Sequence, residues 1–576
     1  MAKGKIARPG WADTKVSFGL ELRANGEIRG LYPLTELDAK GKSRPQSRSL
    51  PAPVKRTVGI SPNFLWDNSA YILGFDGKGK PERALRCFET SKELHLSLLK
   101  KAETPFAQAI CAFFSNWNTE KAQEHPFISE HIEKLKAGGN LIFLYDMIQP
   151  SDDAVLAQVW QEHYDKDSDG DGEKPATMRC LVTGQEAVPE KIHPAIKNVR
   201  GAQPSGASLV TFNAAAFCSY GREQNLNAPM SKYAAFAYTT TLNHLLAEWE
   251  YVQQIGDATI IYWTQDAANQ ERDIFKHSLN GEEVNKEDLR RILEKLAAGE
   301  AVDWNGLPVR PDNRFYVLGL SPNAARVFVR LFLQNTFGNI AQNLLRHYHD
   351  MKIVRPSFEK REILPLWVVL RETVNPNAKD KTASPEIAGD TLRATLTGGR
   401  YPEPLYQAIQ LRIRADRVIN YTRAAMIKAY LKRNTNLEIC KGESMVQLNE
   451  DTSYPPYVLG RLFALLEDIQ SAANPKINTT IKDKYLSSAC AAPATVFPRL
   501  LDLTQKHLRK LEPKLRIYYS KQLGGLTALL TESFATHHTL HDQGVFQLGY
   551  YHQTQKRYEK KTEPDNCEHN KKGEET

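Results

Sequence analysis

The chain has 576 residues, more than one hydrophobic core normally supports, so we expect several domains. Its hydrophobic content of 41% and charged content of 25% are ordinary for a globular protein, and no apolar run is long enough to cross a bilayer. There is no secretory signal pattern, and none of the seven cysteines forms a CxxC pair, so we expect a cytoplasmic protein without a disulfide framework or a zinc ribbon. The net charge of +8 is modest, so the distribution of the charges is more informative than their sum.

The N-terminal part begins with predicted strands. Residues 16–22 and 28–34 are separated by Asn25-Gly26, a pair that suits a two-residue hairpin turn because both residues tolerate positive φ. Residues 40–56 are rich in Ser, Pro, Lys and Arg and contain no acid, which predicts a flexible basic loop. The elements expected next are helices at 94–117 and 128–135 and a short buried strand at 141–145.

An acidic run follows at residues 165–172. Asp165, Asp167, Asp169 and Gly170 match EF-hand positions one, three, five and six, but position twelve is Ala176, where a bidentate Glu is needed. We therefore interpret the run as a solvated loop and expect no metal site in the chain.

The second half of the chain is mostly helical in pattern. Residues 315–330 combine a strand-like run, a Ser-Pro-Asn break and a second structured run with two arginines. Apolar residues then recur at helical spacing, which predicts helices at 326–351, 404–434, 458–470, 496–511, 515–531 and 540–558.

These elements predict an α+β multidomain protein, with a mixed α/β N-terminal region followed by a C-terminal helical bundle. The limits that we assign are 1–395 for the N-terminal region (with room for two subdomains), 396–440 for a basic helical connector, 445–558 for the bundle and 559–576 for a charged tail, which we expect to be disordered.

The strongest electrostatic feature is the segment 400–434, in which eight cations stand against two acids and give a local balance of +6. Four tyrosines interleave with the cations, and this combination suits phosphates and stacked bases. The same pattern also fits helices whose long side chains cover a core. The predicted nucleic-acid backbone contacts are Lys55, Arg56, Arg400, Arg412, Arg414, Arg417, Arg423, Lys428, Lys432 and Arg433.

A second candidate site lies between residues 63 and 80, where short amides and lysines flank a glycine-bearing loop at 74–79. Glycine permits a close approach to a duplex, and Asn or Lys can donate to base-edge acceptors there. A plain surface turn is the alternative interpretation. The loop lacks the GxxxxGK[ST] spacing of a nucleotide-phosphate cradle. The predicted duplex-binding residues are Asn63, Asn68, Lys78 and Lys80.

Signs of catalysis are weak. His349-Asp350 and His541-Asp542 are HD pairs such as some metal-dependent phosphohydrolases use, but no further ligands at suitable spacing are recognisable. No GxSxG elbow or HExxH motif is present. We therefore expect a protein that is not an enzyme and needs no cofactor, with an HD-type phosphohydrolase or nuclease as the alternative.

Several blocks occur together, in order, across most of the chain: KRTVGISPNFLWDNSAYILG at 55–74, CLVTGQEAVPEKIHPAIKNVRGAQPSGA at 180–207, and further blocks at 209–246, 315–330, 399–434 and 543–553. In this arrangement the chain resembles the large subunit of the type I-C CRISPR surveillance complex, known as Cascade. Family members usually open with a short helical segment, and here the chain starts MAKGKIARPGW instead.

The resemblance implies a non-catalytic subunit of an RNA-guided antiviral complex. It implies recognition of the short motif beside the target (the PAM) by the N-terminal region, duplex opening, binding of the displaced strand and recruitment of a helicase-nuclease. The implied partners are the crRNA-containing backbone and guide-handle-binding subunits, target double-stranded DNA and displaced single strand, with no membrane. A small subunit resembling the bundle is implied as well, produced from an internal start that we place at Met445.

Overall fold

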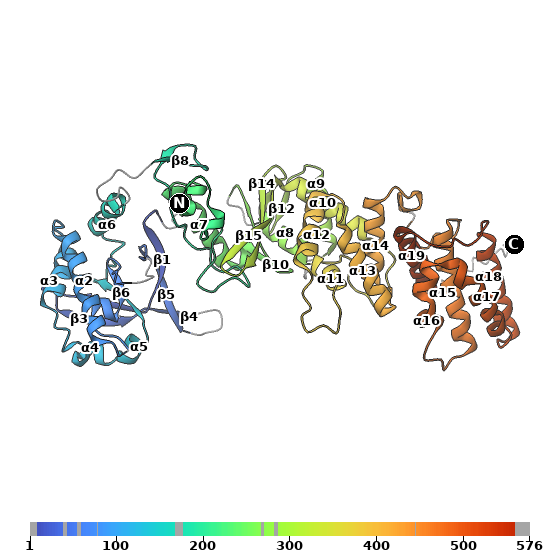
Figure 1. Ribbon diagram of the computed structural model, residues 1–576, viewed down its shortest axis with the longest axis horizontal. Coiled ribbons are helices and arrows are strands. Elements are labelled where there is room, and N and C mark those ends of the chain that lie inside the picture. Colours follow the sequence, from blue (N-terminus) through green and yellow to red (C-terminus); the bar gives the residue numbers. More distant parts are fainter. Residues whose placement is uncertain are drawn as a thin grey trace, which may run out of the picture. The chain divides into compact units, whose positions relative to one another are not determined.

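The structure is a computed structural model that describes residues 8–37, 43–54, 59–77, 79–167, 177–266, 270–280, 286–443 and 445–558. The chain forms two compact units. Unit 1 comprises Met1–Ala195 and Val210–His244, and unit 2 comprises Ile196–Leu209 and Leu245–Thr576. Sheets lie mainly in the first half of the chain and helices in the second half, which confirms the predicted α+β class (Figure 1).

Unit 1 is built on a four-stranded mixed sheet with the order β3-β2-β7-β6. Its strands are β2 (Phe18–Leu22), β3 (Ile28–Pro33), β6 (Trp66–Asn68) and β7 (Asn140–Leu144). The predicted hairpin between β2 and β3 is present, but its turn is longer than two residues. Arg23 and Glu27 close the turn through the Glu27 carbonyl, and only Gly26 has a positive φ, +83°. A Cβ at Gly26 would overlap the backbone of Phe113, so glycine is required there.

Helices cover one face of this sheet, chiefly α2 (Pro81–Leu99), α3 (Pro105–Asn116) and α6 (Ala154–Asp167). The helix expected at 94–117 is divided into α2 and α3. Thr104 breaks it, because its hydroxyl accepts from the Ala107 amide at 3.3 Å and caps α3, with Pro105 at the first helical position.

The basic loop expected at 40–56 was partly wrong. Residues 43–51 form a strand, β5 (Ser43–Pro51), which pairs along its length with β1 (Trp11–Val16) and with the short β4 (Thr35–Leu37). Leu50 is fully buried on this strand, so pairing and burial overcome a composition rich in Ser and Pro. Lys55 and Arg56 lie outside the described residues.

Unit 2 contains an antiparallel sheet with the order β10-β11-β14-β15. Its strands are β10 (Val252–Ile255), β11 (Ala258–Thr264), β14 (Arg314–Asn323) and β15 (Arg326–Thr336). Its inner face packs on the helices α8 (Gln270–Asn280), α9 (Lys286–Ala297), α10 (Phe337–Met351) and α12 (Pro385–Thr397) through one apolar core. The helix expected at 326–351 was therefore wrong in its first half, because the β-branched and aromatic residues of 327–333 pair with β14. Thr336 then caps α10.

The remaining helices of unit 2 share one hydrophobic core that runs from Met351 to Tyr551. They are α11 (Leu366–Arg371), α13 (Glu403–Asp416), α14 (Tyr421–Asn434), α15 (Pro455–Ala473), α16 (Ile481–Ala491), α17 (Pro493–Leu508), α18 (Pro513–Ala528) and α19 (Leu540–Lys556) (Figure 1). The predicted connector and the predicted bundle thus pack together, since α14 lies against α19 and Met445 is buried in the common core. The assigned domain limits stay predictions.

The six cysteines within the described part of the chain carry free thiols. In the same residues, no helix combines the length and the apolar character that a membrane span needs. Most of the acidic run at 165–172 and the tail at 559–576 fall outside the described residues.

Candidate nucleic-acid interface

In unit 1, Asn68 ends β6 and caps the short helix α1 (Ser69–Ile72). Its Oδ1 accepts a hydrogen bond from the backbone amide of Ala70 at 3.0 Å, and the backbone amide of Asn68 donates to Asp67 Oδ1 at 2.8 Å. The side-chain nitrogen Nδ2 has no partner among the described residues. The cap therefore orients Asn68 so that a hydrogen-bond donor remains available.

Asn63 has a different role from the one predicted. It is buried, and its side-chain Oδ1 accepts from the Val54 backbone amide at 2.9 Å. The backbone amide of Asn63 donates to Asp67 Oδ2 at 2.9 Å. Because this side chain is buried and its Oδ1 binds the Val54 backbone, we do not retain it as a base reader. Lys78 lies outside the described residues.

Beside Asn68 is a cavity of about 410 Å³ with basic side chains on its rim. Lys80 and Arg83 belong to the start of α2, and Lys136 ends α5 (Ile132–Lys136). Asp76 also lines the cavity, so cations exceed acids by three to one among its charged side chains. A Cβ at Gly77 would overlap the carbonyl oxygen of Lys136, so only glycine lets this loop close against α5. The predicted Asn68, Lys80 and glycine loop thus meet here, joined by Arg83 and Lys136, which were not predicted from the sequence.

A buried histidine supports this segment from behind. Leu65 has a positive φ of +67°, unusual for leucine, and its amide donates to His95 Nε2 at 2.8 Å. The other ring nitrogen of His95 lies 2.7 Å from the Ser91 carbonyl, and the ring stacks on Phe64 and Phe114. Burial lowers the pKa of His95 to about 4, so the ring stays neutral and can accept at Nε2. In the sequence, His95 is one polar residue in a helical run, with no signal of this role.

Buried neutral histidines make the fold acid-sensitive. Burial lowers the pKa to about 4 for His95 and to about 3 for His347 and His552, whereas the unfolded chain protonates near 6.5. Because the pKa is lower in the folded state, the contribution of each neutral ring to the free energy of unfolding is fully present above pH 6.5. That contribution is lost as the pH falls from 6.5 toward the folded-state pKa. We expect the step from pH 7 to pH 5 to cost about 2 kcal/mol for His95 alone. Urea unfolding of the wild type and a His95→Gln variant at both pH values measures this, and an equal loss in both proteins would contradict it.

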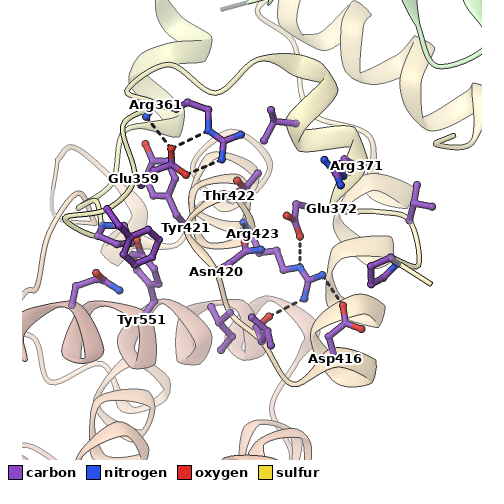
Figure 2. A pocket seen from close by; sticks show the side chains of 18 of the residues that line it. Glu359, Arg361, Arg371, Glu372, Asp416, Asn420, Tyr421, Thr422, Arg423 and Tyr551 are labelled. Carbon is purple, nitrogen blue, oxygen red and sulfur yellow. Dashed lines mark hydrogen bonds and ion pairs between the residues drawn. The ribbon is translucent and has the colours of Figure 1, made fainter. Parts of the chain in front are cut away.

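The predicted basic segment 400–434 is divided between exposed and buried cations. Arg400 and Arg417 are exposed, Arg414 donates to Gln543 Oε1 at 2.8 Å, and Arg412 is ion-paired with Asp416. Figure 2 shows Arg423 between two acids: it donates to Glu372 and to Asp416, each at 2.7 Å.

Three of the predicted cations lie inside the protein: Arg423, Lys428 and Arg433. Lys428 donates to the Asp350 backbone carbonyl at 3.0 Å, and burial lowers its pKa to about 8. Arg433 and Lys432 both pair with the Asp350 carboxylate, at 2.6 and 3.0 Å. We do not retain Arg423, Lys428, Lys432 or Arg433 as phosphate contacts. The balance of +6 overstated the surface charge, because Glu372 and Asp350 come from outside the counted segment.

The two HD pairs have structural partners. Asp350 is paired with Lys432 and Arg433, as described above. Asp542 accepts hydrogen bonds from the Tyr454 and Thr539 hydroxyls, both at 2.7 Å, and Thr539 caps α19. Within the described ranges, no three His, Cys, Asp or Glu side chains gather in a way that could hold a metal ion. No observation favours the phosphohydrolase alternative, and the absence of catalysis stays a prediction.

Helices α16, α17 and α18 carry further exposed cations, here called the basic surface of α16–α18, of which Lys506 is ion-paired with Asp502. Helix α18 exposes most of its length and buries only Leu523 and Leu526, and Tyr518 is exposed on it. The exposed cations of this surface are Lys484, Arg499, Lys506, Arg509, Lys510, Lys514, Arg516 and Lys521. Cations beside an exposed ring suit a single strand of nucleic acid.

The basic cavity beside Asn68 and the basic surface of α16–α18 are thus candidate sites for nucleic acid. Comparison with known families supplies the class: a family model described as CRISPR-associated protein (Cas_Csd1) matches residues 1–558. The match covers nearly the whole chain, so the chain belongs to this family of CRISPR-associated proteins, which gives it a role in CRISPR defence. None of the curated proteins matches the chain.

Proposed function

We propose that the chain is the large subunit of the type I-C Cascade complex and carries out recognition rather than chemistry. The observation that supports this most directly is the basic cavity beside Asn68, in a chain whose family match runs from residue 1 to residue 558. In RNA-guided complexes, guide pairing reads the target sequence while protein reads a short duplex element and backbone shape.

In this proposal the cavity binds the PAM duplex. Lys80, Arg83 and Lys136 neutralise phosphates, and Asn68 Nδ2 donates to a base-edge acceptor in the groove. The glycine-permitted loop lets the backbone approach the duplex closely. Because His95 holds the backbone before β6, the donor is positioned before DNA arrives.

The displaced strand is assigned to the basic surface of α16–α18, with phosphates on its lysines and arginines and a base on Tyr518. The partners are the crRNA-containing backbone, the guide-handle-binding subunit and the helicase-nuclease, with a small subunit translated from Met445. Such a product would lack α13 and α14, whose Tyr406 and Ile427 pack against Gly544 of α19. We therefore expect it to be stable only within the complex.

The test measures binding of the assembled complex to DNA duplexes in which the base pairs beside a guide-matched target are randomised. Asn68→Asp keeps the oxygen that caps α1 but removes the amide donor, so we expect discrimination between good and poor flanking motifs to fall by about 1–3 kcal/mol. Lys80→Glu with Arg83→Glu should flatten the dependence of log affinity on log salt by up to about two units.

Arg86→Glu is the matched control, because Arg86 is an exposed arginine of α2 that does not line the cavity. It should leave discrimination unchanged. If Asn68→Asp preserves the ratio of affinities while the double variant lowers affinity no more than Arg86→Glu, the cavity is not the PAM site.

A further inference from the structure

A large cavity in unit 2 is separate from the basic sites. It has a volume of about 890 Å³ and lies among residues 356–361, helix α11, the start of α14 and the end of α19 (Figure 2). This volume is in the range of sites that enclose a ligand or a group of side chains.

Aromatic side chains dominate the cavity. Phe358, Trp367 and Tyr558 line it while remaining 83%, 50% and 66% exposed, and Tyr421 and Tyr551 lie deeper. Large apolar side chains exposed around a concave surface are costly in water, and their clustering marks a surface that a partner covers.

The charged groups of the cavity are mostly neutralised by one another. Arg361 donates twice to the Glu359 carboxylate at 2.9 Å, and Arg423 bridges Glu372 and Asp416 (Figure 2). Arg371 and Lys381 also line it, and neither side chain makes a hydrogen bond or ion pair with the described residues. The cavity is thus an aromatic hollow with two available cations at its edge.

These features select among the occupants. Residues 559–576 follow Tyr558 directly but contain no aromatic, Leu, Ile, Val or Met residue that would fill the hollow. A nucleic-acid strand would bring several phosphates to a lining with three carboxylates, where Arg361 and Arg423 are already ion-paired and two cations remain, enough for one or two added acids. A protein segment satisfies both features, because a large apolar side chain fills the hollow while a neighbouring carboxylate pairs with Arg371 or Lys381.

We propose that this cavity is a docking site for a peptide segment of a partner protein that carries a bulky apolar anchor beside an Asp or Glu. The proposal does not depend on the PAM assignment, because the two sites lie in different units and share no residues. Trp367 and Phe358 contact the anchor, and Arg371 selects the acid.

The test selects a random phage-displayed peptide library on the full-length chain and measures fluorescence anisotropy of the enriched peptides after synthesis. We expect them to share an aromatic or large aliphatic residue close to an acid. Trp367→Ala and Arg371→Glu should each weaken their binding by about tenfold or more, and Phe358→Ala, at a highly exposed position, should weaken it without a risk to folding.

Leu411→Ala is the control, since Leu411 is an apolar residue on α13, outside the cavity, whose exposed fraction lies between those of Trp367 and Phe358. It should not change peptide affinity, and single-stranded oligothymidylate should not displace the peptides. The proposal is overturned if no selected peptide depends on Trp367, if Arg371→Glu has no effect, or if the oligonucleotide competes and itself requires Trp367.

Discussion

Replacement of Asp350 by alanine is expected to lower the free energy of unfolding by about 3–5 kcal/mol. The carboxylate is 3% exposed and lies 2.6 Å from the Arg433 guanidinium, which is 2% exposed. Burial alone would raise the pKa of Asp350, but hydrogen bonds from Arg433 and Lys432 hold that pKa below its usual range, so the group is ionised. Without it, Arg433 keeps its charge inside the protein with two backbone carbonyls and the Tyr401 ring beside it, and no carboxylate.

Urea unfolding of the full chain measures this, with His349→Ala as the control. The His349 side chain is 45% exposed, so its removal should change stability by less than about 1 kcal/mol. The pair of variants also addresses the phosphohydrolase alternative. If Asp350 were a metal ligand, its replacement would abolish hydrolysis and leave the fold intact. If it is an ion-pair residue, its replacement lowers the free energy of unfolding. Equal stability of the two variants would contradict the structural role.

Alanine at Gly460 or Gly549 is expected to destabilise unit 2 by several kcal/mol, opposite in sign to the usual effect. Gly→Ala inside a helix normally stabilises by about 0.5–1 kcal/mol, because alanine restricts the unfolded chain. Here α15 and α19 cross so closely that a Cβ at Gly460 would overlap the Phe546 carbonyl oxygen, and one at Gly549 would overlap the Tyr457 carbonyl oxygen. Backbone cannot move aside as a flexible side chain can, so the two helices must separate.

The control is Gly524→Ala on α18, where an added Cβ meets no atom within 4 Å. This variant should be at least as stable as the wild type, because only the helix propensity changes. Denaturant unfolding of the three variants compares the two environments directly. If Gly460→Ala and Gly549→Ala are as stable as Gly524→Ala, the close crossing of α15 and α19 is incorrect.

The sequence by itself determined features that depend on local pattern. Apolar residues at helical spacing located the helices observed as α15, α17, α18 and α19, although α16 was missed. Ordered sequence blocks identified the CRISPR-associated family. The close approach of the glycine loop at 74–79 to a duplex stays a prediction, and in the structure Gly77 packs against the Lys136 carbonyl. The helical spacing and the glycine loop lie within short stretches of chain, where periodicity and backbone sterics act without reference to distant residues. The family blocks are matched by residue identity and order, which need no knowledge of the fold.

Only the tertiary structure decided which polar residues remain available. Residues 326–336 became a strand because β14 offered a long pairing partner. Asn63 and Asn68 look alike in the sequence, and in each the side-chain Oδ1 accepts from a backbone amide. Asn63 is buried, however, whereas Asn68 is half-buried and lines the cavity. Arg423 and Arg433 add to the local charge in the sequence, but in the structure they are ion-paired with Glu372 and Asp350. Burial and ion pairing are set by residues far away along the chain, so a local count of charges cannot separate cations that bind a partner from cations that hold the core together.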